Sequence, residues 1–207
     1  YKGNGSAWFD KVEILIDGKP IEKPLKELTS EQITAIKNYI YPLNSFEPTS
    51  GDSTHLEILK TLVGNSKVVA LGEATHGTSE IYKMKDRLTR YLAKNQNFNI
   101  FSLEAYMQQA YLANDYTIKN TATLNEALKN LVFFVWKTQE MSTMLQWMKQ
   151  YNNGSQKILF TGFDMQDATE PIKQLYKAFS EDKDFAQKIE KLSSAVKEFA
   201  NENRGNT

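Results

Sequence analysis

The stretch VVALGEATHGTSEIYKMKDRL, residues 68–88, decides which fold we expect of this chain. It opens with a continuous apolar run of the kind found in a parallel strand that is covered on both faces. The run ends at Gly72, and Glu73 and His76 follow directly after it. A helical pattern of apolar residues begins after Gly77. The stretch therefore predicts a buried strand over residues 68–71, a short polar loop and a helix.

The same alternation continues further along the chain. Residues 99–103 and 157–164 are two more apolar runs, and amphipathic helical patterns lie between them and after them. Strands that alternate with helices predict an α/β fold with a mainly parallel sheet flanked by helices. Three strands are few for such a sheet, and no strand follows the last helix. We therefore expect the domain to be truncated at its C-terminus and to lack the second half that would complete it.

The first 24 residues differ from the rest of the chain. Residues 12–17 have roughly strand spacing with one face more polar, because Val12, Ile14 and Ile16 alternate with Glu13, Leu15 and Asp17. Asp17 followed by Gly18 favours a tight turn. This pattern predicts a short N-terminal β segment over residues 1–24, ahead of an α/β domain over residues 25–207. The segment is either the end of a preceding β-sandwich domain or an edge strand of the main domain.

Composition excludes several classes of function. The chain has 25 basic and 25 acidic residues, so it offers no basic surface for nucleic acid or for an anionic membrane. No apolar run approaches the roughly 18 residues that a membrane-spanning helix needs. Cysteine is absent, which excludes disulfides, thiolate nucleophiles and cysteine-based zinc sites. A cytoplasmic and an exported bacterial protein both fit this composition.

Polar side chains follow each of the three predicted strands. Glu73 comes after the first strand, Glu104 after the second and Asp164 at the end of the third, while His76 lies in the first loop. The carboxyl ends of parallel strands meet at one edge of the sheet, and open α/β sheets bind their ligands at that edge. We therefore expect these four side chains to lie close together.

Their chemistry suits proton transfer. A histidine such as His76 can take a proton from water and return it to a leaving group. A carboxylate on its other ring nitrogen would fix the tautomer and stabilise the imidazolium. Lys85, one turn after Ile81 on the predicted helix, could reach the same edge and stabilise an oxyanion.

Simpler interpretations exist for several of these residues. Glu104 and Asp164 could cap the helices that follow them, and Lys85 could extend into solvent. The second histidine, His55, lies in the first turn of a predicted helix and is interpreted as a surface residue. Five large side chains are interpreted as core rather than as a binding site: Trp136, Trp147, Met141, Met144 and Met148.

Four motifs in order resemble those of the erythromycin esterase family. They are GEATHGTSE followed by a helix, a strand that ends in LEA, the helix WKTQEM…LQWMKQYN, and the strand end FTGFDMQ. The resemblance covers about residues 54–170. It implies an enzyme that hydrolyses an ester, a macrolide lactone in the named members, with a water that a histidine activates.

The resemblance also implies roles for individual residues. His76 matches the general base, and Glu73 belongs to the same active-site cleft. Glu104 matches the carboxylate that orients the histidine or the water. Lys85 occupies a position where the family has a basic residue.

The last motif adds Asp164 and Gln166, which match the GxDxQ block and would bind or support the substrate. Family members also use a further histidine and an arginine from the C-terminal half of the domain. No histidine follows His76 in this chain. The resemblance therefore implies that the C-terminal half of the site is missing from these residues.

Two other functions stay open at this point. A wider superfamily with a Gly-Glu-x-x-His signature includes metal-dependent hydrolases and peptidases, and carboxylates with one histidine could hold manganese or magnesium. A non-catalytic binding domain is the third possibility. The favoured interpretation is a metal-independent hydrolase without a cofactor, whose partner is a small-molecule ester or lactone.

Overall fold

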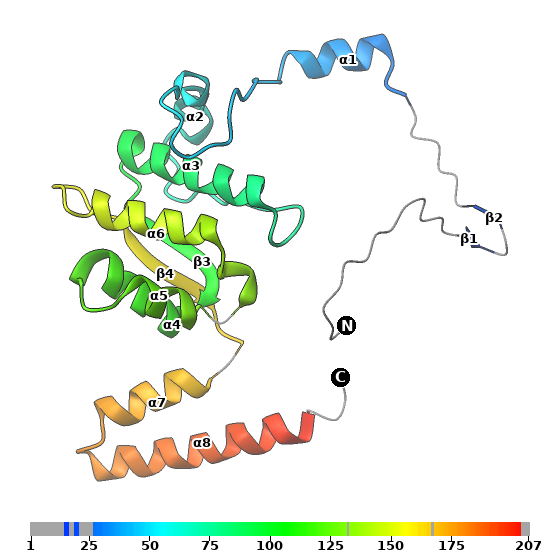
Figure 1. Ribbon diagram of the computed structural model, residues 1–207. Coiled ribbons are helices and arrows are strands. Elements are labelled where there is room, and N and C mark those ends of the chain that lie inside the picture. The colour runs from blue at the N-terminus through cyan, green and yellow to red at the C-terminus, as the bar shows by residue number, and fades with distance from the viewer. Residues whose placement is uncertain (1–14, 17–18, 21–26, 132, 167, 204–207) are drawn as a thin grey trace, which may run out of the picture. The chain divides into compact units, whose positions relative to one another are not determined.

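The computed structural model describes residues 15–16, 19–20, 27–131, 133–166 and 168–203 (Figure 1). The chain divides into two units, one up to Pro42 and the other from Leu43 onward. The division at residue 24 that the sequence indicates stays a prediction. No described helix combines the length and apolarity that a membrane crossing requires.

The first unit contains a short hairpin and one helix. β1 (Leu15–Ile16) pairs antiparallel with β2 (Lys19–Pro20). The N-terminal β segment is therefore present, although most of residues 1–24 lie outside the described part. Thr29 caps the N-terminus of helix α1 (Ser30–Lys37), and its side chain accepts from the backbone N–H of Gln32 in a capping box.

The second unit is the α/β domain and contains one sheet. Its elements alternate as the sequence predicts, and the mixed α/β fold is confirmed. In chain order they are η1 (Thr54–Leu56), α2 (Ile58–Val63), α3 (Ser79–Gln96), β3 (Ile100–Tyr106), α4 (Met107–Asn114), the π-helical turn η2 (Asp115–Lys119), α5 (Leu124–Asn130), η3 (Phe134–Trp136), α6 (Gln139–Tyr151), β4 (Leu159–Asp164), α7 (Thr169–Ala178) and α8 (Lys183–Asn203).

Strands β3 and β4 run parallel, as predicted. Ile100 is opposite Leu159 at one end, and Tyr106 is opposite Asp164 at the other. The register shifts between Leu103 and Tyr106, so β3 carries an irregularity just where Glu104 lies. The carboxyl ends of both strands therefore meet at one edge.

Gly162 allows the two strands to approach closely at that edge. A Cβ atom at this position would overlap the backbone oxygen of Ala105, closer than real Cβ atoms come to any neighbour. The close packing of β4 against β3 thus explains why the first position of the GxDxQ motif is a glycine.

The predicted strand at residues 68–71 is wrong. These residues have no regular secondary structure, and Val68 is 81% exposed. They line a cavity together with β3 instead of pairing with it. An apolar run forms a buried strand only where a neighbouring strand pairs with its backbone and other elements cover its side chains. Within the described residues, a cavity lies between residues 68–71 and β3 instead.

Helices cover one face of the sheet. Leu103, Ala105 and Phe160 point into a core shared with α4, α5 and α6, and α6 lies across the two strands in Figure 1. The predicted methionine stripe of α6 and Trp136 belong to this core, while Trp147 packs at its margin. On the opposite face, apolar side chains are exposed: Ile100, Leu159 and Phe163.

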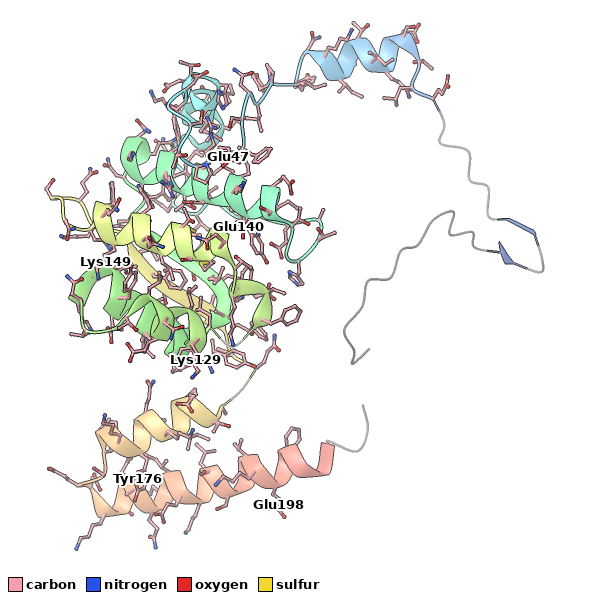
Figure 2. The ribbon with its side chains drawn as sticks, viewed as in Figure 1. Glu47, Lys129, Glu140, Lys149, Tyr176 and Glu198 are labelled. Carbon is pink, nitrogen blue, oxygen red and sulfur yellow. The ribbon has the colours of Figure 1, made fainter. Side chains whose placement is uncertain are left out.

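The interpretation of His55 as a surface residue is also wrong. Its side chain is only 6% exposed, and its Nε2 lies 3.0 Å from Nη2 of the buried Arg87 on α3. Arg87 also donates to the backbone oxygens of Glu47 (3.1 Å) and Asp52. Residues 46–55, which we call the strap, are therefore fastened to α3, and Figure 2 shows Glu47 beside this helix.

Candidate active site

The loop after Gly72 brings the histidine and a carboxylate into contact. His76 Nδ1 hydrogen-bonds Glu73 Oε1. An ionised carboxylate can only accept, so Nδ1 carries a proton, and in the neutral imidazole Nε2 then presents its lone pair. The His76 side chain is 59% exposed, whereas that of Glu73 is 12% exposed. The imidazole thus faces solvent while its carboxylate partner is mostly covered.

Lys85 binds the other oxygen of the same carboxylate. It lies on α3, where the helix passes the loop, and its Nζ contacts Glu73 Oε2. Burial alone raises the pKa of Glu73, but the hydrogen bonds and charges of Lys85 and His76 lower it, and the net pKa lies below the ordinary 4.5. Glu73 is therefore ionised at neutral pH and is held between two basic side chains.

Glu104 lies at the end of β3, close to this group. Its backbone oxygen accepts a hydrogen bond of 2.8 Å from the indole Nε1 of Trp136. Its side chain is exposed and lines the same cavity as Glu73 and Lys85. The structure therefore brings Glu104 to the site, but it is Glu73 rather than Glu104 that contacts the histidine.

The cavity beside this group has a volume of about 650 Å³. Glu73, Lys85 and Glu104 supply polar groups to its wall. Most of the other lining side chains are apolar: Val69, Leu71, Leu92, Phe98, Phe101, Leu103, Ile158 and Phe163. A largely apolar cavity with a few polar groups is typical of a small-molecule site, and its volume lies in the usual range of roughly 300–1,000 Å³.

Asp164 and Gln166 do not join this group. Asp164 ends β4 opposite Tyr106, and its Oδ1 accepts from the backbone N–H of Met165 at 2.8 Å. Its Oδ2 is buried without a hydrogen-bond partner among the described residues. Gln166 lies exposed in the following bend. Neither residue lines the cavity, so their supporting role stays a prediction.

Two aromatic residues at the site were not identified as site residues from the sequence. Tyr82 is one turn before Lys85 on α3, and its hydroxyl accepts a hydrogen bond of 3.1 Å from the backbone N–H of Gly77. Trp136 meets the His76 ring edge to face, with centroids 6.5 Å apart. The three-residue spacing of Tyr82 and Lys85 on one helix was a usable signal, whereas nothing in the sequence placed Trp136 beside the histidine.

The described residues contain no group of three or more histidine or carboxylate side chains arranged to hold a metal ion. Glu73, the most enclosed carboxylate of the site, already uses both oxygens on His76 and Lys85.

Comparison with known proteins assigns the chain to a family. The family model described as erythromycin esterase matches residues 93–206, which is more than half of the chain. The chain belongs to the erythromycin esterase family. The matched range includes Glu104, Asp164 and Gln166, while the Glu73–His76 loop and Lys85 lie before it.

Several curated proteins are similar to this chain in sequence. The Bacillus subtilis protein YbfO, whose name assigns it provisionally to the hydrolases, is 27% identical over 131 residues, which are 63% of this chain and 28% of YbfO. The type II erythromycin esterase of Escherichia coli is 29% identical over 108 residues, 52% of this chain and 25% of that protein. The chain thus spans little more than a quarter of these relatives, whose names indicate a family of hydrolases.

Solved structures share the fold. The crystal structure of a succinoglycan biosynthesis protein superposes with a TM-score of 0.68 at 28% identity, covering 81% of this chain and 43% of the other. A histidine-to-asparagine mutant of the erythromycin esterase EreC, in its open conformation, gives a TM-score of 0.59 at 25% identity, covering 73% and 38%. Because less than half of each neighbour is matched, the described α/β unit corresponds to part of a larger fold.

Proposed function

We propose that this chain is part of the catalytic domain of a hydrolase that cleaves an ester or lactone with a water activated by His76. The observation that carries the proposal is Glu73, which is held between His76 Nδ1 and Lys85 Nζ. Membership of the erythromycin esterase family supports the reaction class. It does not favour the metal-dependent alternative.

The proposed reaction begins at His76. Its Nε2 takes a proton from water as the water oxygen attacks the carbonyl carbon, and the carbonyl π electrons move to oxygen. The ionised Glu73 stabilises the imidazolium that forms, because its Oε1 accepts the hydrogen bond from Nδ1–H and its negative charge lies beside the ring. As the tetrahedral intermediate collapses, the carbon–oxygen single bond breaks and the imidazolium returns its proton to the alcohol oxygen. The sum of the steps is the addition of one water.

Lys85 and Glu104 would assist this sequence. The ammonium group of Lys85 places a positive charge beside Glu73, where it favours negative charge that develops on the carbonyl oxygen. Glu104, at the wall of the cavity, would orient the attacking water. The apolar remainder of the wall suits the hydrocarbon body of the substrate, and a macrolide lactone is one such substrate.

The decisive experiment incubates the full-length gene product with a panel of macrolides and simple esters. Mass spectrometry then detects products that have gained one water. We expect His76→Ala to lower kcat on the order of 10²–10⁴-fold. Lys85→Met should lower kcat as well, whereas Lys83→Met is the matched control, because Lys83 lies on the same helix but pairs with Glu47.

Two results would contradict the proposal. A His76→Ala variant that is folded and fully active would exclude the histidine as the base. Activity that is lost on dialysis against a chelator and restored by a divalent cation would favour the metal-dependent alternative. Absence of product from macrolides alone would change the substrate class and leave the reaction class standing.

A further inference from the structure

Two buried aromatic residues connect the three segments that carry the candidate site. Tyr82 on α3 is 6% exposed, and Trp136 in η3 is 3% exposed. Their rings pack against each other with centroids 5.3 Å apart and an angle of 32° between planes. We call them the aromatic pair.

Tyr82 binds the loop that carries His76. Its hydroxyl accepts from the backbone N–H of Gly77, the residue directly after the histidine. Gly77 has φ of +83°, a conformation that other residues rarely adopt, so the chain turns sharply here. The Tyr82 hydroxyl therefore fixes the end of the loop at the point where its backbone is most unusual.

The chemistry of Tyr82 suits a fixed acceptor. Burial raises the pKa of its hydroxyl, the hydrogen bond from Gly77 lowers it, and the nearby carboxylates of Glu73, Glu104 and Glu140 raise it further, so the net pKa is raised. The phenol thus stays neutral throughout the working pH range. Lys85 Nζ lies 5.8 Å from the centroid of the same ring, so one side chain contacts both the loop and the lysine.

Trp136 contacts the imidazole and the end of the sheet. Its ring meets that of His76 at 76°, and its Nε1 donates to the backbone oxygen of Glu104. The imidazole is otherwise largely exposed and would rotate freely around a single hydrogen bond to Glu73. The indole limits that rotation and sets the distance between the histidine and the carboxyl end of β3.

We propose that Tyr82 and Trp136 are positioning residues that hold His76 in the orientation required for base catalysis. This inference rests on the proposed function of His76. It predicts that removing the polar atom of either member of the aromatic pair disturbs the imidazole while the protein stays folded.

The test uses Tyr82→Phe and Trp136→Phe in the full-length gene product. Tyr82→Phe removes only the acceptor of the Gly77 N–H, and loss of one such hydrogen bond should lower kcat roughly threefold to tenfold with little change in KM. Trp136→Phe removes the Nε1 donor and shrinks the ring, and should lower kcat by about tenfold or more. The matched control is Tyr91→Phe, because Tyr91 is buried in the same helix but its hydroxyl contacts no residue of the site.

A second measurement reads the imidazole directly. Nitrogen-15 NMR at about pH 8 reports the tautomer of a neutral histidine, and comparison with His76→Asn identifies the His76 signals. We expect the parent and Tyr91→Phe to show His76 protonated at Nδ1. Tyr82→Phe and Trp136→Phe should show a mixture with the Nε2-protonated form.

The outcomes separate this inference from the proposed function. If His76→Ala stays active but the two variants still alter the tautomer, the proposed function fails, and the aromatic pair orients the imidazole for a purpose other than base catalysis. If both variants are folded and keep the parent's tautomer and kcat, the positioning role is overturned. Thermal unfolding of each variant verifies that a lost signal does not reflect a lost fold.

Discussion

Glu73 connects the electrostatics of the site to the stability of the fold. Its carboxylate is largely enclosed and accepts hydrogen bonds from two basic side chains, His76 in the loop and Lys85 on α3. An enclosed carboxylate without partners would be costly, and Lys85 would lose its counter-charge if Glu73 were neutral. The Glu73 side chain thus joins the loop to α3 and orients the imidazole of His76.

Glu73 should contribute to the pH dependence of stability. Because its pKa is lowered in the folded protein, its contribution is present above the ordinary value of 4.5 and is lost as the pH falls through the lowered pKa. The free energy of unfolding of the parent should therefore fall more steeply below about pH 4.5 than that of Glu73→Gln. Urea unfolding at several pH values measures both curves. Glu80→Gln, which changes an exposed carboxylate in the first turn of α3, is the control. Parallel curves for the parent and Glu73→Gln would contradict the prediction.

At the scale of elements, α3 connects the loop of the site, the strap and α6. One side of it carries Tyr82 and Lys85 and faces the site. Another side carries Arg87, which fastens the strap at residues 46–55. The helix is also attached to α6, because Ser79 donates to Glu140 at 2.5 Å. The orientation of the loop that carries Glu73 and His76 therefore depends on contacts that lie outside it.

Loss of the Arg87 side chain should release the strap. Arg87→Met leaves the backbone oxygens of Glu47 and Asp52 and the ring of His55 without their donor, so we expect a loss of about 2–4 kcal/mol in the free energy of unfolding. Lys83→Met is the matched control, since it removes exposed contacts of the same strap: an ion pair with Glu47 worth about 0–1 kcal/mol and a cation–π contact with Phe46. Urea unfolding compares the two variants. Equal stability of both would show that the strap does not depend on Arg87.

The β3–β4 pair should not tolerate a side chain at Gly162. In Gly162→Ala the new methyl group meets the Ala105 backbone oxygen, so the strands must separate, and overpacking of this kind costs about 1–3 kcal/mol. Gly51→Ala is the control, because no atom lies within 4 Å of a Cβ there and its backbone is unstrained. Thermal unfolding of the two variants tests the prediction. An unchanged transition in Gly162→Ala would mean that the strands move apart without cost.

At the scale of the whole molecule, the sheet has one covered face and one exposed face. Ile100, Leu159 and Phe163 present apolar side chains on the exposed face, next to the unpaired residues 68–71. Contiguous exposed apolar surface on a globular protein marks a place where something else packs. This open face agrees with the partial coverage of the solved neighbours, of which the chain matches less than half.

The exposed face should make the 207-residue polypeptide bind apolar molecules when it is produced alone. We expect strong binding of the fluorescent dye ANS, which reports accessible apolar surface, and a clear decrease in the double variant Leu159→Thr, Phe163→Ser. Leu62→Ser is the control, because Leu62 is similarly exposed but lies on α2, away from the sheet. An equal decrease in Leu62→Ser would mean that the sheet face is not the site of dye binding.

Much of the architecture follows from local pattern. The helices at residues 79–96 and 139–151 and the strands at 100–106 and 159–164 agree with the periodicity of the sequence. The parallel arrangement then brings Glu104 and Asp164 to one edge without further information. Glu73 and His76 lie three residues apart in one short loop, so the sequence also placed them in the same region, although it did not identify Glu73 as the partner of the histidine.

The sequence pattern could not predict which residues contact each other in the folded protein. The apolar run at 68–71 has the composition of a strand, but pairing and cover come from other segments, and the described residues provide neither. Local sequence is equally silent on which carboxylate meets the histidine and on what buries His55, since Lys85, Trp136 and Arg87 reach these places from other elements. The sequence by itself determined the helices, the two parallel strands and the family motifs, because these depend on neighbours along the chain. Only the tertiary structure decided the contacts of Glu73, the aromatic pair and the open face of the sheet, because these depend on groups that are distant in sequence.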